Sequence, residues 1–494
     1  MSYWSLLEQD DQATLALVWL LESAPGNAML VTDVMTQLSL SRYKLNKSVE
    51  ESQKIFNEMP ELIDWQIELK HGLVVLQNAT FAGFRILQLH LLKRNMTYKI
   101  LFFEYFVRRH GDRRHFFDNA HISQARYYAL RSQIQTEFHT QDAFQNLVGV
   151  SVHPEFAKRA DLTSFCYYYF SGIESPFPEL EEVSSHFLNF LAMTLKLSLT
   201  PSQRLKLKLF FQVQVQRIHG FHDLNTRSSV QLESNQTTGF IVNFYNHYVP
   251  NIENTDVSSE VTYLYLFLLS QKMIDDVPLK LETKLTKRLN LAVQESQKYL
   301  NQTPIINHQR LSVADADHVI DQLLTIGNWL AFFNMTTTPE QYELNIDRLA
   351  QSFPGIVSLA RELCEIAQRT SQLKLPADSV PKIVYNFVVL LIDLLPTDVI
   401  EDQVTVCIDF GQSNVPVNYI ENLLQLHILG GVHVTHSLTA ATDIYLSDTV
   451  VNDLNQAIQI TWPNPLQTND WSALNDVVNQ LKQQKIAKLQ VIGK

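Results

Sequence analysis

RRHFFDNAHISQARYYALRSQIQTEF, residues 113–138, is the stretch that decides the predicted fold of this 494-residue chain. Residues 113–117 favour a short helix, and the polar segment 118–121 then favours a break. A second helix is predicted over 124–138, with Ser123 as the N-cap that accepts a backbone N–H. A short helix, a turn and a longer helix are typical of a helix-turn-helix.

The second helix of this stretch has an apolar stripe and a polar outer face. The stripe from Tyr127 to Phe138 advances by three or four residues at each step, so it is expected to pack inward. The remaining positions are polar, basic or aromatic, as in a helix that enters the DNA major groove. The predicted DNA-contacting residues of this segment are Arg113, Arg114, Ser123, Gln124, Arg126, Tyr128 and Arg131.

Positive charge is concentrated around the same stretch. Residues 81–140 hold ten Lys or Arg against four acidic residues, a net charge of +6 in a chain whose net charge is −12. A cationic module suits a polyanionic partner, because each phosphate that is neutralised releases condensed counterions. The ordinary alternative is a solvated basic face on a structural bundle.

A second pattern of the same kind lies upstream. Residues 42–56 (RYKLNKSVEESQKIF) predict a helix that buries Leu45 and Phe56, and residues 62–77 (LIDWQIELKHGLVVLQ) predict a hairpin. Two tandem patterns are a more specific signal for DNA binding than one. The predicted DNA-contacting residues here are Arg42, Tyr43, Lys44, Asn46, Lys47 and, on the hairpin, Lys70.

The predicted architecture is mainly α-helical and multidomain. Three helices and a hairpin predict a winged helix-turn-helix over 1–78, and a second helix-turn-helix occupies 79–160. Two helical bundles are predicted over 161–278 and 279–400. In 401–494, strand and helix patterns alternate with short links, which predicts a small parallel α/β domain.

Composition excludes several classes of protein. Only 14 Gly and 17 Pro describe folded, largely helical material, and the three cysteines are far apart without metal-binding spacing. No catalytic constellation, metal site or cofactor motif is present, so neither an enzyme nor a cofactor is predicted. The amino terminus lacks the features of a signal peptide, and the apolar runs are too short to span a bilayer. A cytoplasmic protein with no membrane contact is therefore expected.

The order of these parts resembles the Mga/AtxA family of Gram-positive transcription regulators. In that family the bundles are PTS-regulation domains, and the tail is similar to the EIIB component of sugar phosphotransferase systems. The resemblance covers nearly the whole chain and lies in domain order and length. It implies a DNA-binding regulator that forms a homodimer through its carboxy-terminal domain and has phosphocarrier proteins of the phosphotransferase system as partners.

The chain departs from the histidine pattern of this family. A late helix of a PTS-regulation domain carries a phosphorylatable His, whereas EVTYLYLF places Phe267 at that position. The matching helix of the second bundle, 380–395, contains no His. Any phosphorylation is therefore expected in the first bundle, on His186, which the resemblance favours, or on His219 or His222. The ordinary alternative for each is a histidine with a purely structural role.

The tail departs from the EIIB pattern as well. The phosphocysteine of EIIB proteins lies at the end of a strand, before a glycine-containing loop. Cys407 instead lies inside the predicted strand VTVCID, so a buried and unreactive thiol is expected.

Two other functions remain open at this point. One is an RNA-binding antiterminator with the same regulatory domains, which the long helical amino-terminal part disfavours, because sequence-specific RNA readers usually display aromatic sheet platforms. The other is a phosphotransferase that uses the tail, which the position of Cys407 disfavours.

Overall fold

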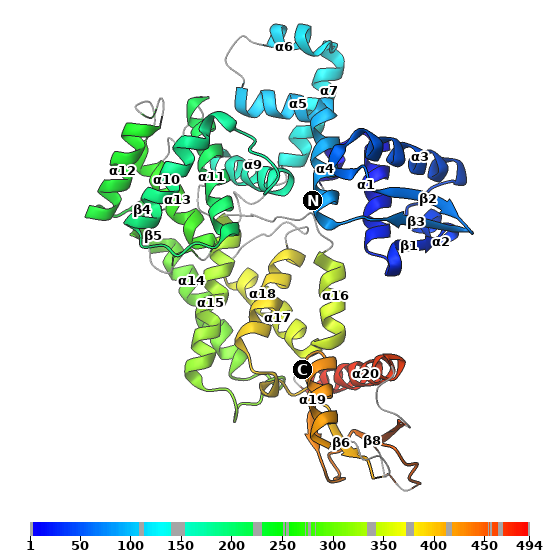
Figure 1. Ribbon diagram of the computed structural model, residues 1–494. Coiled ribbons are helices and arrows are strands. Elements are labelled where there is room, and N and C mark those ends of the chain that lie inside the picture. The colour runs from blue at the N-terminus through cyan, green and yellow to red at the C-terminus, as the bar shows by residue number, and fades with distance from the viewer. Residues whose placement is uncertain are drawn as a thin grey trace. The chain divides into compact units, whose positions relative to one another are not determined.

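The computed structural model describes residues 3–107, 113–139, 154–220, 230–249, 252, 256–271, 273–274, 278–281, 283–332, 342–371, 380–411, 417–452, 454, 457–462 and 468–492. The chain is mainly helical and forms two compact units (Figure 1). The first unit contains the elements from η1 to β5, and the second contains those from α14 to α20. Among the described helices, none combines the length and the hydrophobicity needed to cross a membrane. The predicted division into five domains is finer than these two units and stays a prediction.

The first unit begins with helices and a small antiparallel sheet. The order of elements is η1 (Tyr3–Leu6), α1 (Gln9–Glu22), η2 (Pro25–Asn27), β1 (Ala28–Leu30), α2 (Val31–Gln37), α3 (Arg42–Glu58), η3 (Pro60–Leu62), β2 (Gln66–Lys70) and β3 (Leu73–Gln77). The hairpin is confirmed, since β2 pairs with β3 and His71 and Gly72 form its turn with positive φ. The strand β1, which was not predicted, pairs with the other side of β3.

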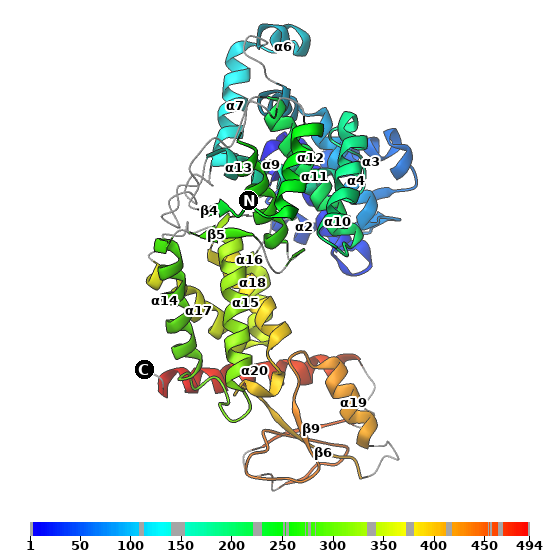
Figure 2. The same ribbon diagram turned by 90° about the vertical axis from the view of Figure 1, so that its left-hand side faces the viewer.

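The next helices lie between residues 81 and 139 and include the predicted helix-turn-helix of residues 113–138. They are α4 (Phe81–Arg94), α5 (Met96–Phe102), the π-helical turn η4 (Phe103–Val107), α6 (Arg113–Ala120) and α7 (Gln124–His139). The apolar run from Met96 to Arg108 favours a single helix by its sequence, but the α-helix ends at Phe102 and continues as η4. The break predicted at 118–121 falls later, because α6 includes Ala120 and the chain turns at His121, whose φ is 49°. In both views α6 lies at the edge of its unit (Figures 1 and 2).

A helical bundle completes the first unit. It consists of α9 (Pro154–Phe170), η5 (Pro178–Leu180), α10 (Glu181–Thr194), α11 (Pro201–His219), α12 (Gln236–Tyr248) and α13 (Val257–Ser270), with a two-stranded sheet of β4 (Val230–Leu232) and β5 (Leu279–Leu281). One hydrophobic core runs from Leu6 through α1, α4 and α9 to Val213 of α11. The amino-terminal helices and the bundle therefore share buried apolar surface, which is the main source of their stability.

The second unit begins with another set of helices. They are α14 (Thr283–Leu300), α15 (Val313–Phe332), α16 (Tyr342–Ser352), α17 (Pro354–Ser371) and α18 (Val380–Leu394), followed by η8 (Thr397–Val399). Their apolar faces enclose one core that contains Leu359, Leu363, Phe387 and Leu391. This core also contains Ile486, which comes from the last helix of the chain.

The tail has the predicted parallel α/β arrangement. Its elements are β6 (Thr405–Asp409), α19 (Val417–His427), β7 (His433–Thr435), β8 (Ile444–Ser447), β9 (Ile458–Thr461) and α20 (Thr468–Ile492). The four strands are parallel in the order β7-β6-β8-β9. Gly430 and Gly431 turn the chain after α19 with φ of 75° and 67°, a left-handed conformation that glycine adopts readily at the end of a helix.

The last helix, α20, belongs to both parts of the second unit. Its residues Leu474 and Val478 lie in the core of the parallel sheet, whereas Ile486 lies in the core of the helices α14–α18. Between these two contacts, Lys482 is buried and donates to the carbonyl oxygen of Gly430 at 2.9 Å. Figure 2 shows α20 running past both the helices and the sheet. The parallel sheet and the helices are therefore joined by packing as well as by the chain.

Candidate nucleic-acid interface

The first turn of α3 displays the side chains that the sequence predicted to touch DNA. Ser41 accepts the backbone N–H of Lys44 at 3.3 Å and so begins the helix. Leu45, Val49 and Phe56 are buried as predicted, which turns the other face outward. The exposed residues of this face are Arg42, Tyr43, Lys44, Asn46 and Lys47. Tyr43 is 78% exposed, an unusual position for an aromatic ring.

Two of the predicted cations near α3 already have acidic neighbours. The Lys47 ammonium lies 2.9 Å from Asp10 and 3.4 Å from Glu51, and the hydrogen bond to Asp10 raises the pKa of Lys47. On the hairpin, Lys70 lies 3.7 Å from Glu68. These pairs are exposed and therefore weak. For Arg42 and Lys44 no acidic partner exists among the described residues, so their charge is available to a ligand.

The helix α7 has the predicted cap and the predicted buried stripe. Ser123 accepts the backbone N–H of Arg126 at 3.3 Å, and Tyr127 and Ile134 are fully buried. Leu130 is half-buried, and the side chain of Phe138 lies outside the described residues. Three of the predicted outer residues, Gln124, Arg126 and Tyr128, are exposed.

Arg131 does not lie on this outer face. It is half-buried, and its Nε lies 3.2 Å from a carboxylate oxygen of Glu104. Arg113 approaches the same carboxylate at 3.6 Å, and the Tyr127 hydroxyl donates to it. Burial, together with this hydrogen bond, raises the pKa of Tyr127. Arg131 and Arg113 therefore hold the protein together as well as carrying charge, which the helical period alone could not reveal.

Much of the positive charge of 81–140 is balanced by acids from other segments. Lys93 pairs with Glu174 at 2.8 Å, Arg94 pairs with Asp11, and Arg126 lies 3.5 Å from Glu8. Arg108 and Arg109 lie outside the described residues. Within the part of the stretch that the structure describes, Lys99 and Arg114 are exposed cations with no acidic partner. The free positive charge is thus smaller than the sequence suggested.

The candidate histidines of the first bundle lie at its surface. His186 is exposed on α10, and its ring contacts those of Tyr248 and Phe244 at centroid distances of 5.1 and 6.0 Å. His219 is exposed as the last residue of α11, whereas His222 lies outside the described residues. Phe267, at the position of the family's late-helix His, is fully buried and stacks on Phe210 with centroids 4.0 Å apart.

The three cysteines are buried. Cys407 is only 2% exposed in β6, and burial raises the pKa of its thiol. Burial also raises the pKa of Cys166, and it raises that of Cys364 to about 11. The prediction of a buried Cys407 is confirmed, and its thiol has little nucleophilic thiolate near neutral pH.

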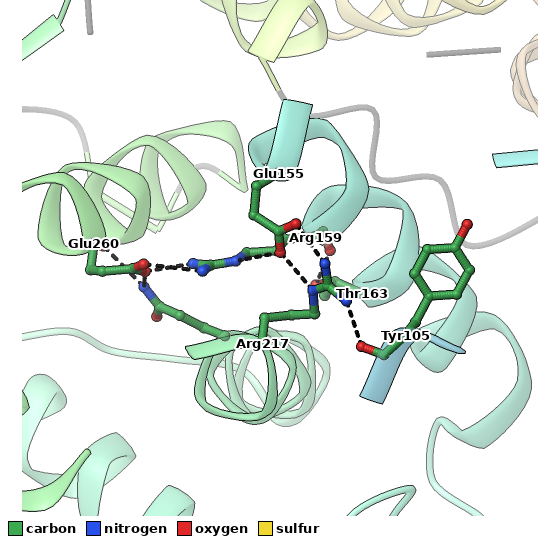
Figure 3. A network of polar contacts seen from close by, with 7 residues as sticks. Tyr105, Glu155, Arg159, Thr163, Arg217 and Glu260 are labelled. Atoms are coloured by element: carbon green, nitrogen blue, oxygen red, sulfur yellow. Dashed lines mark hydrogen bonds and ion pairs between the residues drawn. The ribbon is translucent and has the colours of Figure 1, made fainter. Parts of the chain in front are cut away.

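A buried network of charges in the first bundle was not foreseen (Figure 3). On α9, Arg159 lies 3.2 Å from Glu155 of the same helix and 2.5 Å from Glu260 of α13. Arg217 of α11 binds both oxygens of Glu155, each at 2.6 Å. All four side chains are less than a tenth exposed.

The electrostatics of this network favour the charged forms. Burial alone lowers the pKa of the Arg159 guanidinium, but the carboxylates of Glu260 and Glu155 more than offset this and raise it above its ordinary value. Gln214 adds a bond from its amide to Glu260 at 2.7 Å, and it accepts the hydroxyl of Tyr245 at 2.7 Å. The bonded pair Arg159 and Glu260 lies 101 positions apart in the chain, so only the i, i+4 spacing of Glu155 and Arg159 was visible in the sequence.

Comparison with known proteins does not identify a family for this chain. The chain matches no family model, and no curated protein is significantly similar to it.

Proposed function

We propose that this chain is a DNA-binding transcription regulator, with the first turn of α3 as its principal reading surface. The observation that carries the proposal is the exposure of Arg42, Tyr43, Lys44 and Asn46 together at the start of that helix. In helix-turn-helix proteins the amino-terminal residues of the second helix contact base edges. The order of α1, α2 and α3 followed by the β2–β3 hairpin supports a winged helix-turn-helix, with Lys70 on the wing.

The second reading surface of the proposal is the outer face of α7. Gln124, Arg126 and Tyr128 are exposed there, and α6 adds Arg114, an exposed cation for which the described residues offer no acidic partner. Amide and guanidinium groups are the side chains that most often read adenine and guanine in the major groove. The pairing of Arg131 and Arg113 with Glu104 favours α3 over α7 as the larger contributor to affinity.

Membership of the Mga/AtxA family, a cytoplasmic location and a homodimer complete the proposal. The parallel sheet and its helices agree with an EIIB-like tail. The helix α19 and the residues just after it offer exposed apolar surface for a second copy of the chain. The exposed side chains are Tyr419, Leu426 and Leu429. A two-fold dimer would match a pair of half-sites on the duplex.

The α3 surface gives a direct test of DNA binding. Arg42→Ala and Lys44→Ala should each weaken binding, and each should lower the salt dependence by about one phosphate equivalent if the contact is to the DNA backbone. Tyr43→Ala should cost about 1–3 kcal/mol and relax sequence preference if the ring contacts a base edge. Fluorescence anisotropy on duplexes selected from random sequence measures both effects.

A matched control lies on the same helix. Lys54 is exposed near the end of α3, and its only described acidic neighbour is Glu58 at 4.0 Å. Lys54→Ala should leave DNA affinity and salt dependence unchanged. Equal binding by the parent and all three α3 variants at several salt concentrations would remove α3 from the interface. Tighter binding to an RNA hairpin than to duplexes would favour the antiterminator.

The second test concerns phosphoryl control of the first bundle. His186 should accept a phosphoryl group from the phosphocarrier proteins, because its imidazole is exposed and Phe267 has replaced the late-helix site. The modification adds roughly −1.5 to −2 charges to α10. Mass spectrometry under conditions that preserve phosphohistidine should find the label on His186, and His186→Gln should abolish it. Label on Cys407 instead would point to a phosphotransferase.

A further inference from the structure

The π-helical turn η4 joins two groups of contacts through two consecutive residues. The side chain of Glu104 faces α7, whereas the backbone carbonyl of Tyr105 faces Arg217 of α11. Both sets of contacts lie within the first unit. Single π-helical turns are rare and occur often at functional sites, so this turn merits a functional explanation.

The Glu104 side of the turn contacts α7. The carboxylate is 8% exposed and collects Arg131 and Arg113 at 3.2 and 3.6 Å, together with the Tyr127 hydroxyl. Tyr127 and Arg131 are one turn apart on α7, so the carboxylate fixes the helix at two points. Hydrogen bonds to an ionised group of this kind are shorter and stronger than those between neutral groups, and they are directional.

The Tyr105 side of the turn connects to the bundle. Arg217 donates to the Tyr105 carbonyl, and its guanidinium lies 5.9 Å from the centroid of the Tyr105 ring. The same guanidinium is bound to both oxygens of Glu155, which in turn contacts Arg159 and, through it, Glu260 (Figure 3). A shift of α11 against α9 or α13 therefore also changes the contact between Arg217 and the Tyr105 carbonyl of η4.

We propose that η4 is a coupling element, in which Arg217 and Glu104 are positioning residues that make the placement of α7 depend on the packing of the first bundle. A partly broken buried ionic network leaves a costly unpaired charge, so the contacts of such a network are favoured together or lost together. Where α7 acts on DNA, which rests on the proposed function, the same device gives the bundle control over that surface.

Hydrogen exchange on the DNA-free protein tests the coupling. Arg217→Gln should speed amide exchange in α7 on the order of tenfold while leaving α1–α3 at the parent rate. Arg217→Lys, which keeps the charge, should restore part of the protection. Arg204→Gln is the matched control, since the Arg204 side chain lies on the exposed side of the same helix and, among the described residues, donates only to Asn189.

A second variant works from the opposite end. Glu104→Gln removes the carboxylate charge without touching the bundle, and coupling predicts faster exchange in α11 as well as in α7, because coupling between two sites is reciprocal. Faster exchange confined to α7 in Glu104→Gln, or confined to α9 and α11 in Arg217→Gln, overturns the proposal. Circular dichroism confirms that each variant remains folded under the conditions of exchange.

The exchange experiment separates this inference from the proposed function. If the parent protein binds no selected duplex, DNA binding fails while the exchange result still decides the coupling. If the parent binds DNA and both variants show parent exchange in α7, the coupling fails while the proposed function stands.

Discussion

Replacing Glu260 with alanine should lower the free energy of unfolding of the first unit by about 3–5 kcal/mol. The substitution takes the Glu260 carboxylate away from the fully buried Arg159, and the Glu155 carboxylate that also binds Arg159 is already bound by Arg217. It also removes the carboxylate oxygen that accepts from the Gln214 amide, although the backbone carbonyl of residue 260, which accepts from the same amide at 3.1 Å, is kept. Chemical denaturation followed by circular dichroism, with an intrinsic or attached probe in the first unit, measures the change.

The pair Lys93–Glu174 supplies the control for this prediction. Its two side chains are roughly half exposed and lie 2.8 Å apart, so Glu174→Ala should cost only about 0–1 kcal/mol. Glu260→Gln keeps a hydrogen-bond acceptor but loses the charge, and it should fall between the two alanine variants. An unfolding curve of Glu260→Ala that coincides with that of Glu174→Ala would show that the network contributes little.

The second large effect is expected from removing α20. A chain that stops after residue 467 loses Leu474 and Val478 from the sheet core and Ile486 from the helical core. Truncating even one such side chain to alanine costs about 2–5 kcal/mol, against a total of about 5–15 kcal/mol for a domain. The second unit should therefore lose its cooperative unfolding transition, and limited proteolysis should cut within 283–400 as well as within the sheet.

The shared position of α20 means that truncation is a poor test of self-association. Removing 402–494 to look for a monomer would also open the helices α14–α18, so a change in mass would have two explanations. Leu426→Glu is the cleaner variant, because the side chain is 77% exposed on α19 and contributes to neither core. It should leave unfolding unchanged and shift the protein toward a monomer in ultracentrifugation. A sharp transition in the chain that stops at 467 would contradict the shared role of α20.

Local patterns predicted the elements well where one periodic signal decided the structure. The hairpin at His71-Gly72, the N-cap at Ser123 and the parallel sheet around Cys407 follow from the type and order of neighbouring residues. The strand β1 was missed because three residues are too few to show a period, and β3 rather than its own sequence holds it in place.

The sites were harder to predict, since charge pairing is a property of the folded chain. Arg131 has the spacing of an outer residue, yet it is half-buried because it pairs with Glu104, which lies 27 positions earlier. Arg94 is likewise paired with an acid that is distant in the sequence, Asp11, which lies 83 positions earlier. A count of charges along the sequence therefore overstates the positive surface, because it cannot tell which acids will come to lie beside which bases.

The position of Ile486 in the core of α14–α18 sets an order of events during synthesis. When a ribosome has completed the helices α14–α18, it has yet to make the strands β6–β9 and then Ile486, which completes the core of those helices. At roughly 5–20 residues per second, that delay is on the order of five to twenty seconds for the nascent chain. The described elements of the first unit, η1 to β5, all precede residue 282, so this unit can fold while the second waits. Chaperones that bind exposed apolar surface should therefore associate with nascent chains that end between 400 and 486, and should leave once α20 has emerged.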